Sequence, residues 1–376
     1  MKIFFVVTHL LGTGHLARTL TLAHAFRQAG HKAVIISGGM PAPHLDANGL
    51  TVLQLPPLRS DGTNFKRLLD DLGREVDARY RSLRQADLLS HLKAEKPDVV
   101  VTELFPFGRR TLRHEFGALV DAANKMEPQP LILSSIRDIL APPSKPDRIA
   151  ATHDLIETRY DAVLVHSVEQ LVPLHLSWPL PDALVPRLRY TGFVAPELPE
   201  EPVEKTGETL ISAGGGAIAD PLFDTAITAA KHRLDRPWRM FLGGNPDRVK
   251  RFSRAAPSNM RVEATRPDFR QIMTRAAASV SLCGYNTTMD VLQTGIPAVF
   301  VPFDDGDEQE QTIRANALKG LTGVEVLTSS DLTPEALLKA LDLVEAAPAR
   351  QKWTTEMAGA KGTVAVVETL LQERLS

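Results

Sequence analysis

The chain has 376 residues, of which 43% are hydrophobic and 23% are charged. This is more than one ordinary hydrophobic core contains, so we expect a globular protein with two domains of similar size. A formal net charge of -2 argues against binding of nucleic acids or other polyanions, so we expect no nucleic-acid partner.

The first half of the chain alternates short apolar runs with helical stretches. Residues 2–7 are an apolar run typical of a strand buried on both faces of a parallel sheet. A glycine-rich turn follows at 12–15, and a helix is predicted over 16–29. The longest helical stretch is predicted over 65–96. Further strands are predicted at 32–37, 52–55, 98–102, 131–135 and 162–166.

This alternation predicts right-handed crossovers and a doubly wound α/β sheet, the architecture of a Rossmann-like domain. The carboxyl ends of parallel strands meet at one edge of such a sheet, so the polar residues that end these runs should lie together there. They are Thr8, His9, Ser37, Thr102, Glu103, Ser135, Arg137 and His166.

The second half repeats the design after a proline-rich and acidic segment. We predict an N-terminal domain over 1–193, a linker over 194–208 and a C-terminal Rossmann-like domain over 209–350. The chain is predicted to be helical from Thr333 to its end, and the helix within 351–376 is predicted to cross back to the first domain. Strands of the second domain are predicted at 209–212, 239–242, 261–264, 279–282, 298–301 and 324–327.

One stretch of the second half, residues 281–316, combines a strand end, a glycine turn at Gly284 and a helix that opens on Asn286-Thr287-Thr288. A Gly-Ile-Pro break, a second buried strand, an acidic loop and another helix follow. A helix N-terminus at the carboxyl edge of a parallel sheet offers free amides and the positive end of a dipole. We therefore expect a phosphorylated ligand here.

Two Rossmann-like domains with a glycine turn in each resemble the GT-B glycosyltransferases, and most closely family 28, one of whose members adds N-acetylglucosamine to a lipid-linked peptidoglycan acceptor. The resemblance rests on three patches and extends to most of the chain as architecture. The chain is also similar to a group of bacterial predicted glycosyltransferases with Thr102–Arg109 (TELFPFGR) and Ile136–Asp138 (IRD). The three patches are Gly12-Thr13-Gly14-His15, Gly214-Gly215-Gly216, and Gly284, Thr287 and Asp290 with Gly295-Ile296-Pro297, Gln311 and Asn316.

The resemblance implies an inverting, metal-independent glycosyltransferase with no cofactor, whose co-substrate is a nucleotide-diphosphate sugar, most readily a UDP-sugar. Asp290 stands where the family usually has Glu, and Gly216 where many members have a hydroxyl residue. Amides at the helix start would bind the diphosphate, Asp290 the ribose and Gln311 the sugar. The implied donor-binding residues are Gly14, Gly214, Gly215, Gly216, Arg266, Phe269, Gly284, Asn286, Thr287, Thr288, Asp290 and Gln311.

Inverting transfer needs a base that takes the proton of the acceptor hydroxyl. We expect His15 to be that base, with a pKa near neutrality, because its glycine-rich loop should leave it unshielded. Glu103 is the second candidate, as a base or as a ligand of the acceptor hydroxyl. Alternatively, Glu103 is only the ionic partner of Arg137 or Arg109, and His15 only caps a helix or contacts phosphate.

Other interpretations remain open. The acids of Asp304–Glu308 could bind a divalent ion, although such loops are more often simply solvated, and we expect no metal. The chain could instead be a nucleotide-sugar hydrolase resembling the pseudaminic-acid pathway enzyme, a non-hydrolysing epimerase, or a nucleotide-sugar-binding protein without turnover. The acceptor of a transferase would be a hydroxyl compound, and it could be lipid-linked or anionic.

Location is expected to be cytoplasmic. The single cysteine, Cys283, excludes an internal disulfide and fits a reducing compartment. Residues 2–7 are too short for the core of a signal peptide. No apolar run approaches the length of a membrane span, so we expect at most peripheral membrane contact.

Overall fold

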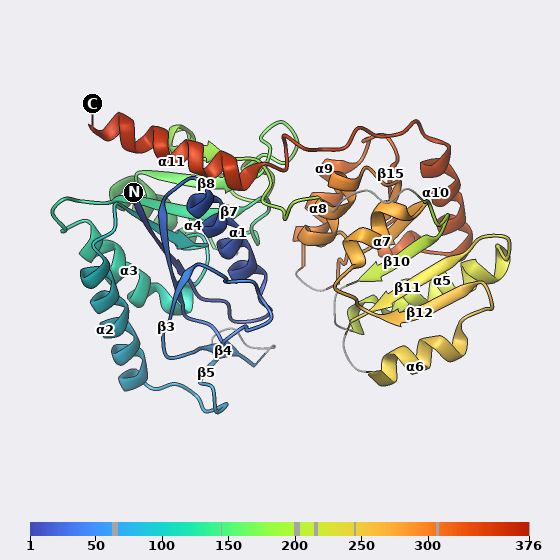
Figure 1. Ribbon diagram of the computed structural model, residues 1–376, viewed down its shortest axis with the longest axis horizontal. Helices are drawn as coiled ribbons and strands as arrows, with labels where there is room; N and C mark the ends of the chain where they lie inside the picture. The colour runs from blue at the N-terminus through green and yellow to red at the C-terminus, as the bar shows by residue number, and fades with distance from the viewer. Residues whose placement is uncertain are drawn as a thin grey trace. The chain divides into compact units, whose positions relative to one another are not determined.

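A computed structural model describes residues 1–61, 67–143, 145–198, 204–213, 217–243, 246–305 and 308–375. It divides into two compact units: Met1–Ala195 with Ala358–Ser376, and Pro196–Met357. The predicted linker at 194–208 therefore begins close to the point where the chain passes from one unit to the other. Each unit is a parallel sheet flanked by helices (Figure 1).

The sheet of the first unit has the strand order β3-β2-β1-β6-β7-β8-β9, and every neighbouring pair is parallel. A short antiparallel pair, β4 with β5, stands apart from it. The strands are β1 (Lys2–Val7), β2 (Lys32–Ser37), β3 (Thr51–Gln54), β4 (Arg59–Ser60), β5 (Leu68–Leu69), β6 (Val99–Glu103), β7 (Leu131–Arg137), β8 (Ala162–His166) and β9 (Leu188–Tyr190). The helices are α1 (Gly14–Gln28), α2 (Ala78–Glu95), α3 (Arg113–Ala123), α4 (Pro146–Arg159) and α11 (Gly359–Leu375).

Helices cover both faces of this sheet, which explains why β1 has no polar residue in its interior. Side chains alternate along the strand. Phe4 and Val6 belong to the core that includes residues of α2, α3 and α4. Phe5 and Val7 belong to the core formed with α1 and α11.

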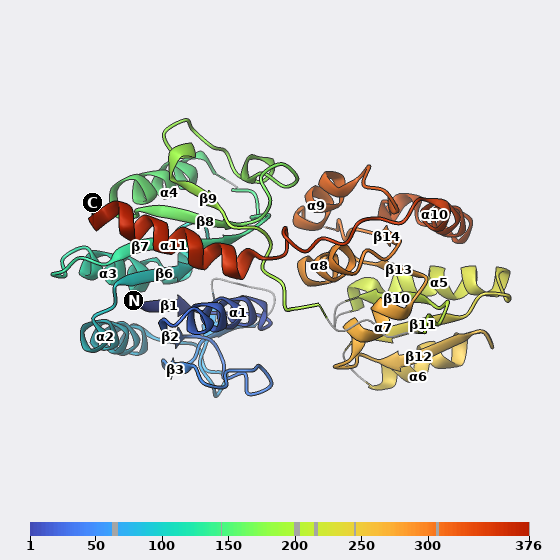
Figure 2. The same cartoon turned by 45° about the horizontal axis from the view of Figure 1, so that its top comes forward.

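The sheet of the second unit has the order β12-β11-β10-β13-β14-β15, which repeats the first six positions of the seven-stranded sheet, again with parallel pairs only (Figure 2). Its strands are β10 (Thr209–Ala213), β11 (Trp238–Leu242), β12 (Met260–Ala264), β13 (Ala278–Ser281), β14 (Ala298–Phe300) and β15 (Val324–Val326). Its helices are α5 (Asp220–His232), α6 (Pro246–Ala255), α7 (Phe269–Arg275), α8 (Tyr285–Thr294), α9 (Glu310–Leu318) and α10 (Pro334–Ala346). The predicted α/β class with parallel sheets is confirmed.

The strand order reverses between β1 and β6 in the first unit and between β10 and β13 in the second. Ligands of open parallel sheets bind beyond the carboxyl ends of the strands at such reversal points. The residues that follow β1 and β6, and those that follow β10 and β13, are therefore the ones to inspect for function.

The helix predicted over 65–96 is wrong in its first part. Leu68–Leu69 pairs with Arg59–Ser60 as a strand, and the helix begins only at Ala78. Asp77 explains this start, because its side chain accepts a hydrogen bond of 2.7 Å from the Tyr80 amide and thereby caps the helix.

The prediction of continuous helix from Thr333 to the end is also wrong, since α10 ends at Ala346 and α11 begins at Gly359. Pro348 lies in the break, where a proline cannot continue the hydrogen bonds of a helix. The short strand β9 was not predicted.

The last helix, α11, packs on the first unit beside α1 (Figure 1). Val364 and Val367 enter its core, and Arg374 donates a hydrogen bond of 2.9 Å to the Pro130 carbonyl. A Cβ at Gly362 would overlap the Thr191 carbonyl oxygen, so only glycine allows this close approach. In the described part of the chain, no helix has both the length and the apolar character that a membrane crossing requires.

Candidate active site

The two predicted candidates for the catalytic base lie together in the first unit. His15 is the second residue of α1, which follows β1 through a turn that contains Gly12 at a φ of 55°. Glu103 is the last residue of β6, the strand beside β1. The His15 Nδ1 atom lies 2.9 Å from the Glu103 Oε1 atom.

Glu103 is buried and surrounded by donors. It accepts hydrogen bonds from His15, from the Arg18 guanidinium and, at 2.8 Å, from the Ser135 hydroxyl. Burial alone would raise the pKa of Glu103, but the Arg18 charge and the hydrogen bonds from His15 and Ser135 outweigh it and hold this pKa well below its usual value. Glu103 is therefore ionised, and it forms an ion pair with Arg18.

An ionised carboxylate only accepts hydrogen bonds, so Nδ1 of His15 carries the proton and Nε2 keeps its lone pair. Arg18 Nη2 lies 3.3 Å from the same Nδ1 atom, but a protonated Nδ1 has no lone pair for it to bind. The arrangement can hold a neutral imidazole in the tautomer that acts as a base.

The expectation of an unshielded His15 with a near-neutral pKa is wrong. Its side chain is 19% exposed, and burial, with the nearby Arg109 and Arg18 charges, lowers the pKa of His15 to about 4 against the opposing effect of Glu103. The imidazole is consequently neutral at pH 7, which is the form that a general base requires.

Sequence reasoning missed the groups behind this pair. His166 Nε2 lies 2.9 Å from the Ser135 hydroxyl oxygen, and His166 Nδ1 lies 2.8 Å from the Thr191 hydroxyl. Burial lowers the pKa of His166 to about 3, so this histidine is neutral. From the sequence, Ser135 and His166 could be recognised only as polar residues at strand ends. Arg18 could be recognised only as a residue about one helical turn after His15.

In the second unit, α8 begins after Gly284, whose extended backbone ends the turn from β13. Among the described residues, no side chain caps this helix. Asn286 is exposed and Thr287 half-buried in its first turn. These positions suit the predicted contact of a helix N-terminus with a diphosphate.

Thr288 cannot supply the predicted free amide. Its amide donates a hydrogen bond of 2.9 Å to the carbonyl of the N-cap residue Gly284, because only the N-cap and the first three residues of a helix have unpaired amides. Its side chain is fully buried, and its hydroxyl lies 3.5 Å from the Cys283 sulfur.

Asp290, the predicted ribose ligand, is paired with Arg270, whose Nε atom lies 2.7 Å from a carboxylate oxygen. Burial raises the pKa of Asp290, partly offset by the Arg270 charge. Arg270 also donates to the carbonyls of Pro196 and Glu197. The carboxylate thus takes part in anchoring the chain segment that enters the second unit, a role that the sequence did not indicate.

Arg314 supports the glycine turn from within the second unit. It is almost completely buried, donates a hydrogen bond of 2.8 Å to the Cys283 carbonyl, and places its guanidinium 5.7 Å from the centre of the Tyr285 ring. Gln311, the predicted sugar ligand, accepts a hydrogen bond of 3.2 Å from the Phe303 amide. These contacts tie α9 to the start of α8 and to the end of β14.

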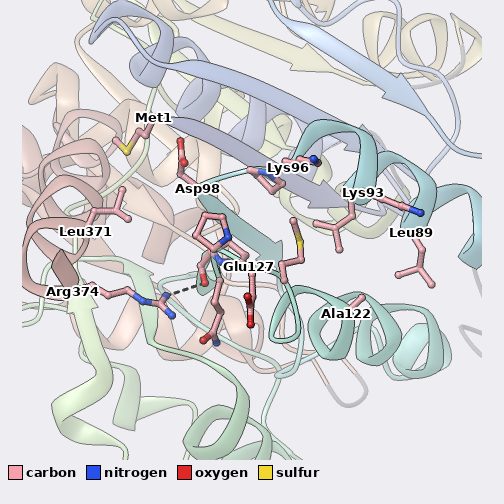
Figure 3. Close-up of a pocket in the computed structure, with 15 residues that line it drawn as sticks. Met1, Leu89, Lys93, Lys96, Asp98, Ala122, Glu127, Leu371 and Arg374 are labelled. Carbon is pink, nitrogen blue, oxygen red and sulfur yellow. Dashed lines mark hydrogen bonds between the residues drawn. The ribbon is translucent and has the colours of Figure 1, made fainter.

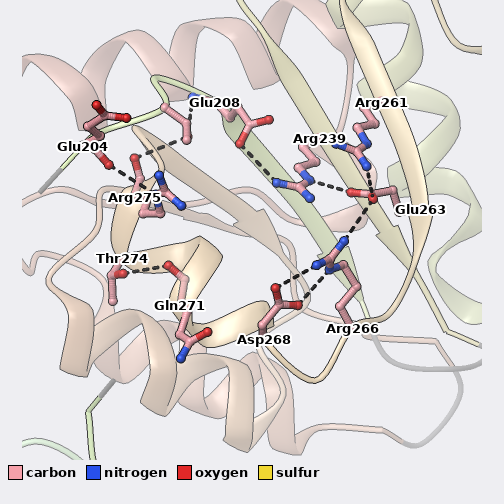
Figure 4. Close-up of polar contacts among 11 residues, drawn as sticks. Glu204, Glu208, Arg239, Arg261, Glu263, Arg266, Asp268, Gln271, Thr274 and Arg275 are labelled. Atoms are coloured by element: carbon pink, nitrogen blue, oxygen red, sulfur yellow. Dashed lines mark hydrogen bonds and ion pairs between the residues drawn. The ribbon is translucent and has the colours of Figure 1, made fainter. Parts of the chain in front are cut away.

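Two of the predicted donor-binding residues, Arg266 and Phe269, follow β12. Arg266 makes two contacts of 2.8 Å with Asp268, and a third of 3.6 Å reaches Glu263 (Figure 4). The Phe269 ring packs edge-on against Phe241 with 5.1 Å between ring centres. The loop therefore keeps its shape through its own ion pairs.

Several predicted positions lie outside the described residues: Gly214, Gly215 and Gly216, and the centre of the Asp304–Glu308 loop. Asp304 itself accepts a hydrogen bond from the Ser329 hydroxyl. Gly14 is exposed at the start of α1. Within the described part, no three or more His, Cys, Asp or Glu residues are grouped so as to hold a metal ion.

A cavity of about 910 Å³ opens at the other edge of the first unit, where Figure 3 shows apolar side chains from α2, α3 and α11 around it. Met1, Asp98 and Pro130 precede β1, β6 and β7, so this cavity lies at the amino ends of the strands. It does not contain His15 or Glu103.

The chain is similar to known glycosyltransferases. A model of the glycosyltransferase family 28 C-terminal domain matches residues 242–370, which include α8 and its glycine turn. An uncharacterized glycosyltransferase of Methanosarcina acetivorans is 25% identical over 351 residues, covering 88% of this chain and 86% of that protein. The UDP-N-acetylglucosamine--N-acetylmuramyl-(pentapeptide) pyrophosphoryl-undecaprenol N-acetylglucosamine transferase of Glaesserella parasuis is 40% identical over 83 residues, or 22% of each chain.

Solved structures resemble the whole chain. MurG of Acinetobacter baumannii has a TM-score of 0.62 at 18% identity, covering 99% of this chain and 100% of that one. The calicheamicin glycosyltransferase CalG4 has a TM-score of 0.64 at 16% identity, covering 100% and 99%. The chain thus has the fold of the GT-B glycosyltransferases, and the domain model matched over 242–370, together with the relatives named above, supports a family 28-like glycosyltransferase.

Proposed function

We propose that the protein transfers a sugar from a nucleoside-diphosphate sugar, with uridine as the nucleoside, to an acceptor hydroxyl, with inversion and without a metal ion. The observation that carries this proposal is the His15–Glu103 pair at the strand reversal of the first unit. The donor assignment is supported by the uncapped start of α8 within the matched domain model, and by a relative named for a UDP-sugar substrate.

The chemistry would proceed in one displacement. Nε2 of His15 takes the proton of the acceptor hydroxyl, while the oxygen of that hydroxyl forms a bond to the anomeric carbon of the donor sugar. The bond from that carbon to the diphosphate oxygen breaks, and the electron pair leaves with the diphosphate. Glu103 stabilises the imidazolium that forms, and amides at the start of α8 stabilise the charge on the leaving group.

Hydrolysis of the donor is the second candidate, since water can replace the acceptor against the same histidine. The test is incubation with a panel of nucleotide sugars, with and without an extract of the source cells, while nucleotide release is measured. Release that requires the extract supports a transferase, and release without it supports a hydrolase. No release from any donor under either condition would contradict both.

Metal independence is tested in the same assay. The dipole and free amides of α8 carry out the charge stabilisation that a divalent ion would otherwise supply. We expect nucleotide release to be unchanged by excess chelator, with chelator plus magnesium as the control. Loss of activity that magnesium restores would instead assign a metal to the site.

A further inference from the structure

The loop Leu104–Arg109 follows Glu103, and the proposed reaction does not account for it. Two of its aromatic side chains anchor it. Phe105 stacks on Phe116 and Phe107 packs edge-on against Trp178, each with 5.1 Å between ring centres. The loop is therefore fixed to the core of the first unit.

Hydrogen bonds fix its backbone as well. The Phe105 carbonyl accepts from the hydroxyls of Thr102 and Ser134, at 2.9 and 2.8 Å. The Gly108 amide donates to the Leu104 carbonyl at 2.7 Å. A Cβ at Gly108 would lie 2.8 Å from the Leu104 side chain, which would have to move to admit it. Such support is typical of a loop that presents a side chain precisely.

Two residues of the loop have left-handed backbone conformations although neither is glycine: Leu104 at a φ of 67° and Arg109 at a φ of 58°. Each such conformation costs on the order of 1–3 kcal/mol and persists where the surrounding structure imposes it. Arg109 is thus held at the end of the loop at a cost in folding free energy.

Two of the three nitrogens of the Arg109 guanidinium lack a hydrogen-bond partner among the described residues. Its Nε and Nη2 atoms are buried and make no hydrogen bond within the described part of the chain. Burial lowers the pKa of Arg109 to about 10, which still leaves it charged at pH 7. A buried donor without an acceptor costs about 1–3 kcal/mol, and more when it is charged.

The Arg109 charge acts on two histidines, His15 and His9. It lowers the pKa of both, and Glu103 in turn raises that of Arg109. Glu103 makes no hydrogen bond to the Nε or Nη2 atom of Arg109, and its carboxylate accepts instead from His15, Arg18 and Ser135. The charges of Arg137 and Arg18 also lower the pKa of Arg109, against the larger opposing effect of Glu103.

We propose that Arg109 binds an anionic group of the acceptor, a carboxylate or a phosphate, beside His15. This inference rests on the proposed function and specifies its acceptor. A guanidinium only donates hydrogen bonds, and its planar fork matches the paired oxygens of these two groups. A neutral acceptor would leave the buried charge unpaired.

The test uses the full-length protein saturated with UDP, so that the donor site is filled, and titrates inorganic phosphate or acetate. The readout is the imidazole NMR signals of His9 and His15, assigned with the variants H9Q and H15Q. We expect saturable shifts with at least one of the two ions, and the tighter of the two identifies the anionic group.

The variant R109Q should weaken this binding at least tenfold, which corresponds to about 1.4 kcal/mol. R109K keeps the charge but loses the fork and should lie between R109Q and the wild type. The matched control is R110Q, which changes the exposed neighbouring arginine and should leave the affinity unchanged. Equal affinities in R109Q and the wild type, or no saturable shift with either ion, would overturn the proposal.

Two further measurements, the melting temperature of R109Q and the binding of UDP, distinguish a failure of this inference from unfolding and from a failure of the donor assignment. R109Q should melt no lower than the wild type, because it removes an unpaired buried charge, so lost binding cannot be attributed to unfolding. The His9 and His15 signals report on the first unit alone. If UDP does not bind, the donor assignment fails, while the response of these signals to phosphate still tests Arg109.

Discussion

At the scale of single residues, the pairing of His15 with an ionised Glu103 determines how the activity should depend on pH. Because burial lowers the pKa of His15 to about 4, the base is neutral above that pH. We expect kcat/KM to stay flat from pH 8 to pH 5 and to fall only as the pH approaches 4. A fall centred near pH 6.5 would show that His15 is unshielded or that another group is the base.

Variants distinguish the proposed role of His15 as the base from that of Glu103 in fixing its tautomer. H15Q removes the base and should lower kcat at least a hundredfold, since general base catalysis contributes about 10²–10⁴-fold. E103Q leaves the imidazole but removes the carboxylate that fixes its tautomer, so kcat should fall while the affinity for UDP stays unchanged. The control R110Q should keep both values.

The linked effect on stability has a definite sign. The pKa of His15 is lower in the folded protein than in the unfolded chain, so the unfolded chain binds the additional proton. The contribution of His15 to the free energy of unfolding is full above pH 6.5 and is lost as the pH falls from about 6.5 to about 4. H15Q should remove this part of the pH dependence.

The sequence identified His15 and Glu103 singly but did not predict that they pair. Their pairing requires β6 to lie beside β1, and strand order is a tertiary property that no local pattern encodes. The lowered pKa of His15 was missed for the same reason, because it depends on burial by elements distant in the chain. Arg18 and Arg270 were missed as partners since an arginine on a helix is most often solvated.

At the scale of secondary-structure elements, the strands were the most predictable part of the fold. Runs such as those at Lys2–Val7 and Lys32–Ser37 are apolar because helices cover both faces of the sheet. The helix predicted over 65–96 failed where its polar composition could not distinguish helix from loop. Its true start depends on the single cap at Asp77.

The contact of α11 with the first unit gives a prediction with a matched control. G362A should lower the free energy of unfolding by about 1–3 kcal/mol, because the added methyl group overlaps the Thr191 carbonyl oxygen. G117A makes the same change inside α3, where a Cβ meets nothing within 4 Å. It should raise the free energy of unfolding by about 0.5–1 kcal/mol through helix propensity.

Urea denaturation of both variants measures these changes. If G362A were as stable as G117A, the close packing of α11 against the segment after β9 would be wrong. If both variants lost stability, the glycine in α3 would have a role that its open surroundings do not indicate.

At the scale of the whole molecule, each of the two units supplies a different part of the proposed reaction. The first holds the histidine, its carboxylate and the loop of Arg109 at its strand reversal. The second holds a helix start beside a glycine turn at the equivalent reversal. The candidate residues lie at equivalent strand ends in both units because the strand order is repeated, although the sequence is not.

Donor binding should therefore stabilise the folded protein, since UDP is expected to bind the native second unit and not the unfolded chain. At a UDP concentration a hundred times its Kd, the stabilisation is about 2.7 kcal/mol. Thr287 is half-buried in the first turn of α8, and a hydroxyl bonded to a charged group contributes about 1.5–3 kcal/mol. T287V should weaken UDP binding about tenfold or more, and calorimetry with UDP measures both the affinity and the shift in Tm.

The control is T369V, which makes the same replacement on an exposed position of α11 in the first unit and should leave UDP affinity unchanged. A T287V protein that melts like the wild type yet binds UDP weakly assigns the hydroxyl to the diphosphate. Wild-type affinity in T287V with a normal shift in Tm would mean that UDP binds through amides alone. No shift in Tm with UDP or any other nucleoside diphosphate would remove the start of α8 as the donor site, and with it the transfer proposed for the whole chain.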